Sequence, residues 1–500
     1  MQIFLKKLTD NSYLLPLVVV AICIWRIFVA QLPANAGLGW DGVRYYQITA
    51  DGLESKVIDS YLILRIFPCL FVHVLFKLAS IAFTPANVIM GFKIMNTVLI
   101  GLSALMVKSV FNHYKLNPVS QVTGFVLVFL NYGVLYFTFY YPVMTDAPAF
   151  FLSIALFYFF IKGDLTNVFL VGLIGAFTFP VIFPMAFALL LFSKKEVEFA
   201  PVNKLLQYAV GAASAIYSVA LGWYLIFVKN EITDFTYTLP INHAMLPVTF
   251  GVVALLFFFM PIVLFNKTFF QLHYYRSQLS GDKIFAAIAL VFLFAILRFS
   301  LVVNVTSEYA TLYHQLKVNL FYAFQYPFIT VVSHFNYFGC VILLMLLFWK
   351  NFSAFISSFG LGVAGSVFVC LFAFSMKPES RALIFFFPWM MILMSLYLGK
   401  SNFNKAFYML IFTLNFITAK LWLFFDYNIE KELLLKDGTF DFPNQWFMMH
   451  LGIWMSEYVW LWLCIVVTVS LLLFIFSLYK IEFGKKEILF YKKYEPLTYE

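Results

Sequence analysis

A group of residues able to do acid–base chemistry follows the first long apolar run, in the stretch Trp40-Asp41-Gly42-Val43-Arg44-Tyr45-Tyr46. A carboxylate at the water–lipid boundary, partly desolvated by aromatic neighbours, can act as a general base toward an acceptor hydroxyl. Asp is also a favoured N-cap, and Asp41 precedes a segment, residues 43–49, that can form a helix. Asp41 is therefore a candidate catalytic base, with helix capping as the alternative. The candidate substrate-binding residues beside it are Arg44, Tyr45 and Tyr46.

A second acid, Asp146, lies 146 − 41 = 105 residues further along, in Val143-Met144-Thr145-Asp146-Ala147-Pro148. Here too an N-cap is plausible, with Pro148 in the first turn of the following helix. Two carboxylates on one membrane face can divide the roles of base and orienting group, or hold a divalent cation. Two acids alone do not make a metal site, so no metal ligand is assigned and a cation stays only an option.

The third group is a short polar turn between two strongly apolar helices, Lys377-Pro378-Glu379-Ser380-Arg381. Charges in a turn are usually just solvated, and this is the plain alternative. Arginine, however, suits phosphate because its planar fork donates two parallel hydrogen bonds. Arg381 and Lys377 are therefore candidates for binding a phosphate, with Glu379 beside them. Arg298, near the end of its helix, is a further phosphate candidate because charges within spans are usually functional.

The segment 304–335 carries more polar side chains that could reach a substrate. Among them, His314 is the candidate substrate-binding residue. The others are Glu308, Tyr309, Lys317 and His334. Their spacing does not distinguish among them. The five cysteines lie in apolar stretches without metal-type spacing, and no P-loop, GxGxxG, HExxH, GxSxG or CxxC motif is present.

The elements that must position these residues are apolar helices. The 500 residues are 63% hydrophobic and 11% charged, with a mean hydropathy of +0.90, which excludes a soluble domain. Spanning helices are expected near 13–31, 87–109, 121–140, 147–161, 205–227, 250–265, 284–303, 336–349, 354–375, 382–398, 404–425 and 456–479, with a hairpin of two short pieces at 166–192. The fold class is all-α and polytopic, with about fourteen crossings.

The basic residues at segment ends indicate which loops face the cytoplasm. They place both termini in the cytoplasm. Basic cytoplasmic loops then account for the net charge of +9, and no nucleic acid is expected as a partner. The substantial outer segments are 32–85, 229–249, 304–335 and 426–455. Within the first, residues 61–81 are apolar but interrupted by Arg65, Pro68, His73 and Lys77, which favours an interfacial helix; a real span is the alternative. The chain divides into a membrane module (1–400), C-terminal helices (401–479) and a basic tail (480–500).

This order of features resembles the GT-C glycosyltransferases, polytopic enzymes that take sugars from polyprenyl-phosphate carriers. The Trp-Asp-Gly of the first outer loop, followed by aromatics, is most similar to the branch of the GPI mannosyltransferases and their bacterial relatives. The stretch Phe139-Tyr140-Tyr141-Pro142-Val143-Met144-Thr145-Asp146 is similar to the Tyr-Thr-Asp segment of a lumenal glucosyltransferase. The resemblance covers roughly the first 200 residues, and after residue 400 no landmark matches, which leaves acceptor recognition unassigned.

The resemblance implies an inverting transfer of a sugar from a polyprenyl-phosphate carrier to a glycan, lipid or protein acceptor on the outer face. It implies that Asp41, the acidic residue of the first loop, is the catalytic base. Asp146 is then the second acidic residue, and Arg381 binds the carrier phosphate. The alternatives are a flippase or transporter of a lipid-linked sugar, and a polymerase of surface glycans. We expect a bacterial cytoplasmic membrane, with the site facing the periplasm or exterior.

Overall fold

The structure is a computed structural model that describes residues 9, 11, 13–28, 34–39, 41–192, 196–229, 242–301, 311, 321–401, 403–423, 452, 455 and 457–479. Over these residues the chain is helical and has no β-strand; an isolated antiparallel bridge joins Pro201 and Asn266. Trp40, His314 and the tail 480–500 lie outside the described residues, as do Glu308, Tyr309, Lys317 and most of the segment 426–455. The all-α prediction is confirmed for the part described.

The first half contains α2 (Leu14–Ile27), α3 (Asp41–Asp51), η3 (Leu62–Arg65), α4 (Phe67–Leu78), α5 (Pro85–His113), α6 (Pro118–Phe129), η4 (Tyr132–Phe137), α7 (Thr138–Tyr140), α8 (Asp146–Lys162), α9 (Leu165–Ala176), α10 (Ile182–Leu191) and α11 (Lys204–Trp223). The second half contains α12 (Leu246–Phe259), α13 (Leu272–Gln278), α14 (Gly281–Ser300), α16 (Ile329–Phe338), α17 (Val341–Ser357), α18 (Leu361–Met376), η11 (Ser380–Leu383), α19 (Phe387–Gly399), α20 (Lys405–Ala419) and α22 (Glu457–Tyr479).

Among the described residues, five helices are long and apolar enough to cross a membrane, or up to seven if each of two bent pairs is one span. The five spans run over 85–113, 204–228, 243–264, 281–300 and 457–478. Seven further apolar helices have 10–17 residues. At 1.5 Å per residue a helix needs about 20 residues to cross the hydrocarbon core, so several runs predicted as spans form shorter helices. The count of about fourteen crossings stays a prediction.

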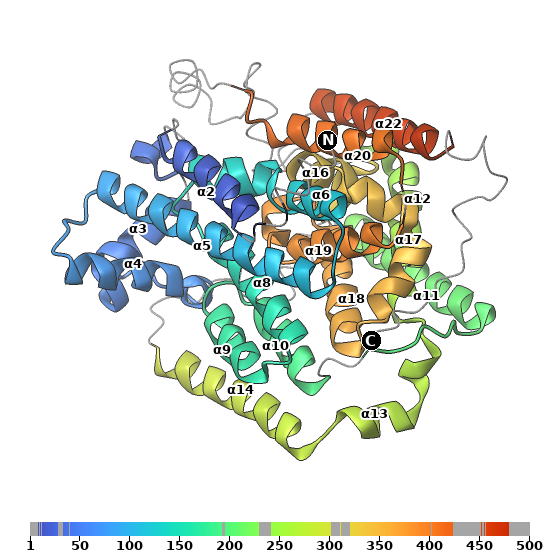
Figure 1. Cartoon of the computed structure of the whole chain (residues 1–500), viewed down its shortest axis with the longest axis horizontal. Coiled ribbons are helices and arrows are strands. Elements are labelled where there is room, and N and C mark those ends of the chain that lie inside the picture. Colours follow the sequence, from blue (N-terminus) through green and yellow to red (C-terminus); the bar gives the residue numbers. More distant parts are fainter. Residues whose placement is uncertain are drawn as a thin grey trace.

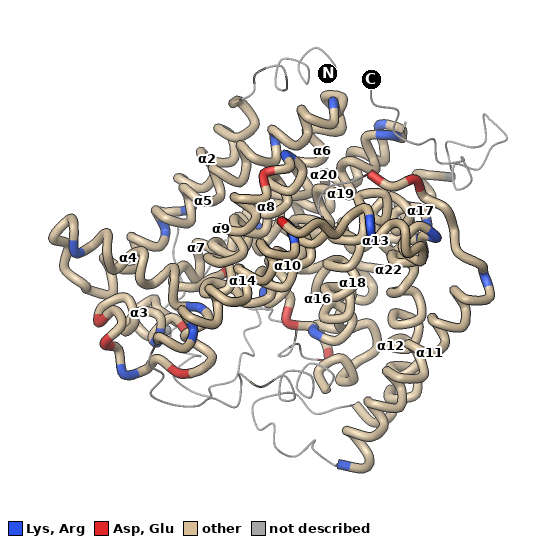
Figure 2. Tube along the Cα trace, turned by 90° about the horizontal axis from the view of Figure 1, so that it is seen from below, with Lys and Arg blue, Asp and Glu red and all other residues tan. Residues whose placement is uncertain are grey.

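The buried core is formed by helices from both halves of the chain (Figure 1). Nearly every residue of α19 is buried, because this helix packs between α6, α8 and α17. By contrast α14 lies at the edge and buries little beyond Ala287 and Leu290. Charged positions fall mostly at helix ends and in turns (Figure 2). A strongly apolar helix left exposed in this way fits a lipid environment, as the composition predicts.

Two bends shape the core. Asn131 accepts a hydrogen bond from Val134 N at 3.0 Å where α6 gives way to the π-helical η4, and the pair bends by 54°. The second bend, of 116°, separates α16 from α17 at Gly339, whose φ is 79°. A Cβ at Gly339 would overlap Asn415 Oδ1, so only glycine fits both the backbone and the space. The prediction of a single helix over 336–349 is therefore wrong, because this turn divides it.

The segment predicted as the first outer loop contains two short helices, α3 and α4, that project to one side of the molecule (Figure 1). α4 has 12 residues, so at about 18 Å it is shorter than the hydrocarbon core of a bilayer, and its place in the interface stays a prediction. One of its faces exposes apolar side chains, Phe67, Phe71, Val74, Leu75 and Leu78. The hairpin predicted over 166–192 is confirmed as α9 packed against α10.

Candidate functional site

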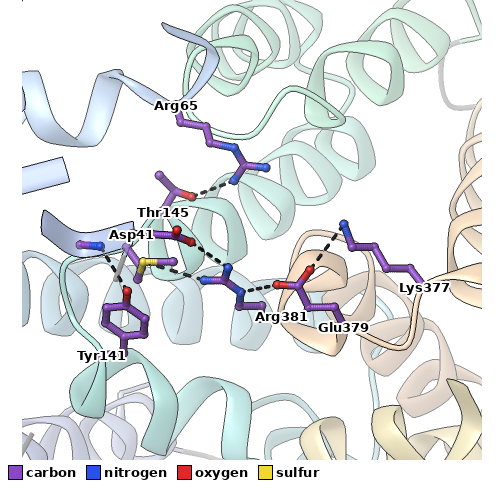
Figure 3. Close-up of polar contacts among 9 residues, drawn as sticks. Asp41, Arg65, Tyr141, Thr145, Lys377, Glu379 and Arg381 are labelled. Carbon is purple, nitrogen blue, oxygen red and sulfur yellow. Dashed lines mark hydrogen bonds and ion pairs between the residues drawn. The ribbon is translucent and has the colours of Figure 1, made fainter. Parts of the chain in front are cut away.

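Four charged residues from distant parts of the chain form one ion-pair network (Figure 3). Arg381, in η11, donates from Nη2 to Asp41 Oδ2 at 2.9 Å and from Nε to Glu379 Oε1 at 2.6 Å. Lys377 Nζ lies 3.7 Å from the second oxygen of Glu379. The structure thus brings Asp41 and the turn 377–381 into direct contact, where the sequence placed them only on the same membrane face.

The Asp41 side chain faces open space while its partners are sheltered. It is 51% exposed, whereas Arg381 is 18% and Glu379 15% exposed. Helix α3 begins at Asp41 itself, two residues earlier than the segment expected from the sequence. A carboxylate held in the first turn of a helix is favoured by the helix dipole, so the capping alternative and a catalytic role are compatible.

Glycines set the position of Asp41 against Tyr141. Gly39 has a φ of 68°, and a Cβ there would overlap the Tyr141 ring. Gly42 N donates a hydrogen bond to the Tyr141 hydroxyl at 3.2 Å. The Trp-Asp-Gly stretch therefore needs its small residues, because α3 starts against a tyrosine that precedes α8.

His334 holds the turn that carries Arg381. The Phe374 carbonyl lies 3.3 Å from His334 Nε2, and a carbonyl only accepts, so Nε2 carries the proton. Nδ1 then accepts from the Ser380 hydroxyl at 2.9 Å. The ring is fully buried against Phe374 and Phe387, with centroids 4.8 and 5.5 Å away. His334 therefore does not reach a substrate itself, but orients the residue next to Arg381.

Asp146 begins α8 and is 4% exposed. Met144, two residues earlier, contacts Arg381 Nη1 through its sulfur at 4.0 Å. Among the described residues, no ion pair or hydrogen bond reaches the Asp146 carboxyl. Burial raises its pKa and the charges of Arg381 and Arg65 lower it, with a net rise to about 6. This carboxyl can therefore exchange its proton near neutral pH.

The pKa values of the two other carboxyls of the cluster, Asp41 and Glu379, are shifted in the opposite direction. Burial acts to raise the pKa of Asp41, but the charge and hydrogen bond of Arg381 outweigh it and hold the pKa below its usual value. The pKa of Glu379 is likewise lowered, since Arg381 and Lys377 outweigh burial. Both are ionised at neutral pH, so the cluster contains two carboxylates of fixed charge and one, Asp146, that titrates.

Arg65 belongs to this site, although the sequence analysis used it only as an argument against a span. Its Nη1 donates to Thr145 Oγ1 at 3.3 Å, directly before Asp146. The guanidinium lies over the Tyr61 and Phe179 rings, 4.6 Å from each centroid. Its Nε is buried without a hydrogen-bond partner among the described residues. An arginine within an apolar stretch was the available signal, because such charges are usually functional.

The remaining candidates lie outside the network. Arg44 pairs with Asp59 at 2.6 Å, and the Tyr46 hydroxyl donates to the Phe83 carbonyl at 2.9 Å. Both contacts therefore hold α3 to the segment that follows it. Tyr45 is 2% exposed and packs in the core. Arg298 lies in the last turn of α14 and has no ion pair among the described residues, so it is not brought to Arg381. His314 lies outside the described residues.

The donor set offers no metal centre. Over the described part of the chain, no group of three His, Cys, Asp or Glu side chains is placed to hold an ion. Two of the three carboxyls near Arg381 are instead neutralised by protein cations. The comparisons with known proteins add no relative: no family model, no curated protein and no solved structure matches this chain.

Proposed function

We propose that the protein is a membrane glycosyltransferase of the GT-C type, which moves a sugar from a polyprenyl-phosphate carrier to an acceptor. The observation that carries the proposal is the half-exposed Asp41 carboxylate held at 2.9 Å by Arg381, with Lys377, Arg65 and the buried Asp146 around it. A carrier lipid keeps its tail in the bilayer and presents a sugar phosphate at the interface. A cluster of cations next to a carboxylate suits that group.

The proposed chemistry is a direct displacement with inversion. The acceptor oxygen bonds to the anomeric carbon while the bond from that carbon to the carrier phosphate breaks, and the electron pair leaves with the phosphate. Arg381 and Lys377 stabilise the departing charge, and Asp41 takes the proton of the acceptor hydroxyl. No step requires a metal ion.

Arg381 links the two halves of this mechanism. In the ligand-free protein it neutralises Asp41 and keeps that carboxylate a weak base. A carrier phosphate that engages the Arg381 fork competes with Asp41, which raises the pKa of Asp41 toward the value that a general base needs. Asp146 orients the acceptor or holds a second proton, because its pKa is already near 6.

The finer topology belongs to the same proposal. About fourteen crossings would place both termini in the cytoplasm and the Asp41–Arg381 network on the periplasmic or exterior face of a bacterial cytoplasmic membrane. The acceptor is then a glycan, lipid or protein outside the cell.

The test is transfer of labelled sugar from a polyprenyl-phosphate carrier in proteoliposomes. Asp41→Asn is expected to lower the rate at least a hundred-fold, as for loss of a general base. Asp51→Asn, an exposed acid at the other end of α3, is the matched control and should retain full activity. Transfer by Asp41→Asn at the wild-type rate contradicts the proposal.

A flippase for a lipid-linked sugar is the second candidate, and buried cations favour it. Arg26 is 2%, Lys93 4% and Lys420 2% exposed, in helical parts of the chain. Charges within membrane helices often line a transport path. A proteoliposome assay separates the two functions: movement of a labelled carrier lipid across the bilayer that survives Asp41→Asn favours transport.

A further inference from the structure

A polar region lies near the C-terminal end of α5, away from the Asp41–Arg381 network. Asn96 of α5 donates to the Pro142 carbonyl at 3.3 Å, close to that network. Lys108 lies 108 − 96 = 12 residues further along, a rise of about 18 Å. Here the chain has a polar hollow of about 440 Å³ and an adjoining apolar groove of about 640 Å³.

Among the described residues, the polar hollow is lined by basic and neutral polar side chains without a carboxylate. Its lining includes Tyr13, Lys108, Ser109, Asn112, His113 and Lys162. Lys108 is 2% exposed, and its Nζ donates to the Thr9 carbonyl at 2.6 Å and to Gln121. Lys162, at the end of α8, is exposed and lies at the rim. Such a hollow favours an anion.

The apolar groove runs on between α2 and α5. It is lined by Pro16, Leu17 and Val20 of α2 and by Val98, Gly101 and Leu102 of α5. Tyr13 and Leu105 line both hollows, so the two form one continuous surface with a polar and an apolar end. A Cβ at Gly101 would come within 2.9 Å of Val20, which shows how closely α2 approaches α5 beside the groove.

The occupant must therefore be an amphipathic anion. An inorganic anion leaves the groove empty, and a neutral lipid brings no net negative charge to Lys162 at the rim. Residues 1–10 carry two lysines and one acid, Asp10, so this segment has no net negative charge to place in the hollow. Basic pockets between membrane helices bind anionic headgroups, and each of the two volumes lies within the range of ligand sites.

We propose that α2, α5 and α8 form a binding site for an anionic phospholipid of the bilayer, with its headgroup phosphate at Lys108 and Lys162 and an acyl chain along the α2–α5 groove. This site is separate from the proposed transferase centre and does not depend on that function. A lipid held there fastens α2, which precedes α3 and Asp41, to α5.

The experiment is native mass spectrometry of the full chain released from detergent with equal amounts of phosphatidylglycerol or phosphatidylcholine. The wild-type protein should retain phosphatidylglycerol preferentially. Lys162→Gln should weaken that retention about five-fold, the effect of one basic residue at an anionic headgroup. Val98→Trp, at a side chain 54% exposed over the groove, should displace both lipids without disturbing the core.

Lys115→Gln is the matched control, since Lys115 is exposed near the same end of α5 but does not line the hollow. It should bind phosphatidylglycerol as the wild type does, and all variants should unfold at the wild-type temperature. Equal retention of the two lipids by the wild type overturns the proposal. So does a Lys162→Gln variant that loses no phosphatidylglycerol.

Discussion

Asp146→Asn is expected to stabilise the protein, and by more at pH 8 than at pH 5. The pKa of Asp146 rises from 3.8 to about 6 on folding, chiefly through burial. The folded state thus binds the proton more tightly than the unfolded state. The stabilisation that this proton contributes to folding is fully present below about pH 4 and is lost as the pH rises through about 6. At 1.36 kcal/mol per pH unit, the buried charge destabilises by about 3 kcal/mol at pH 8 and by about half of that at pH 5. Asparagine keeps the shape and removes the charge.

The measurement is the unfolding free energy of both proteins in one detergent between pH 5 and pH 8. Asp51→Asn removes a negative charge at an exposed position and controls for the change in net charge. A stabilisation that does not grow with pH, or a variant less stable than the wild type at pH 8, would refute the reasoning. It would mean that Asp146 has a strong partner when charged.

Three other substitutions test the supports of the network. Gly39→Ala should destabilise the protein by about 1 kcal/mol because of its φ of 68°, and by about 1–3 kcal/mol more because the new Cβ overlaps Tyr141. Gly163 has a φ of 72° but open space around it, so Gly163→Ala should show only the first effect. Thermal unfolding measures both. Arg381→Met should lower the unfolding free energy by about 3 kcal/mol because buried Glu379 loses its main partner; a loss below about 1 kcal/mol would show the pair to be solvated. His334→Phe should cost about 1–3 kcal/mol because the Ser380 hydroxyl then keeps only a long contact, 3.5 Å, with the Pro378 carbonyl. Wild-type stability would remove His334 as its support.

Much of the helical order could be predicted because membrane helices reveal themselves by apolar length and by the polar residues at their ends. Both the α9–α10 hairpin and the short helix α4 follow from such signals. The division of 336–349 at Gly339 could not be predicted, because it depends on Asn415 lying against that glycine from a helix some 76 residues away (415 − 339 = 76). Hydropathy carries no information about such tertiary contacts.

The site could be predicted residue by residue but not as a network. Asp41, Asp146 and Arg381 stood out because charges are rare in this chain, and the structure places them in one region. Arg65 was overlooked as a partner, since nothing local connects it with Thr145. Arg298 was chosen on the same logic of rarity and lies apart, because a charge near a helix end can also simply reach the surface.

The ion pair between Asp41 and Arg381 closes late in the life of the chain. Its two residues are 340 positions apart, which at 5–20 residues per second corresponds to roughly 20 to 70 s of synthesis. Throughout this interval Asp41 has no contact with Arg381. Because Asp41 is exposed, water can solvate its carboxylate, and the free-energy cost of the unpaired charge is small. Lys377, Glu379 and Arg381 emerge almost together, and Glu379 neutralises one of the two cations at once. The turn keeps one net positive charge, and its docking onto Asp41 supplies the carboxylate that balances it.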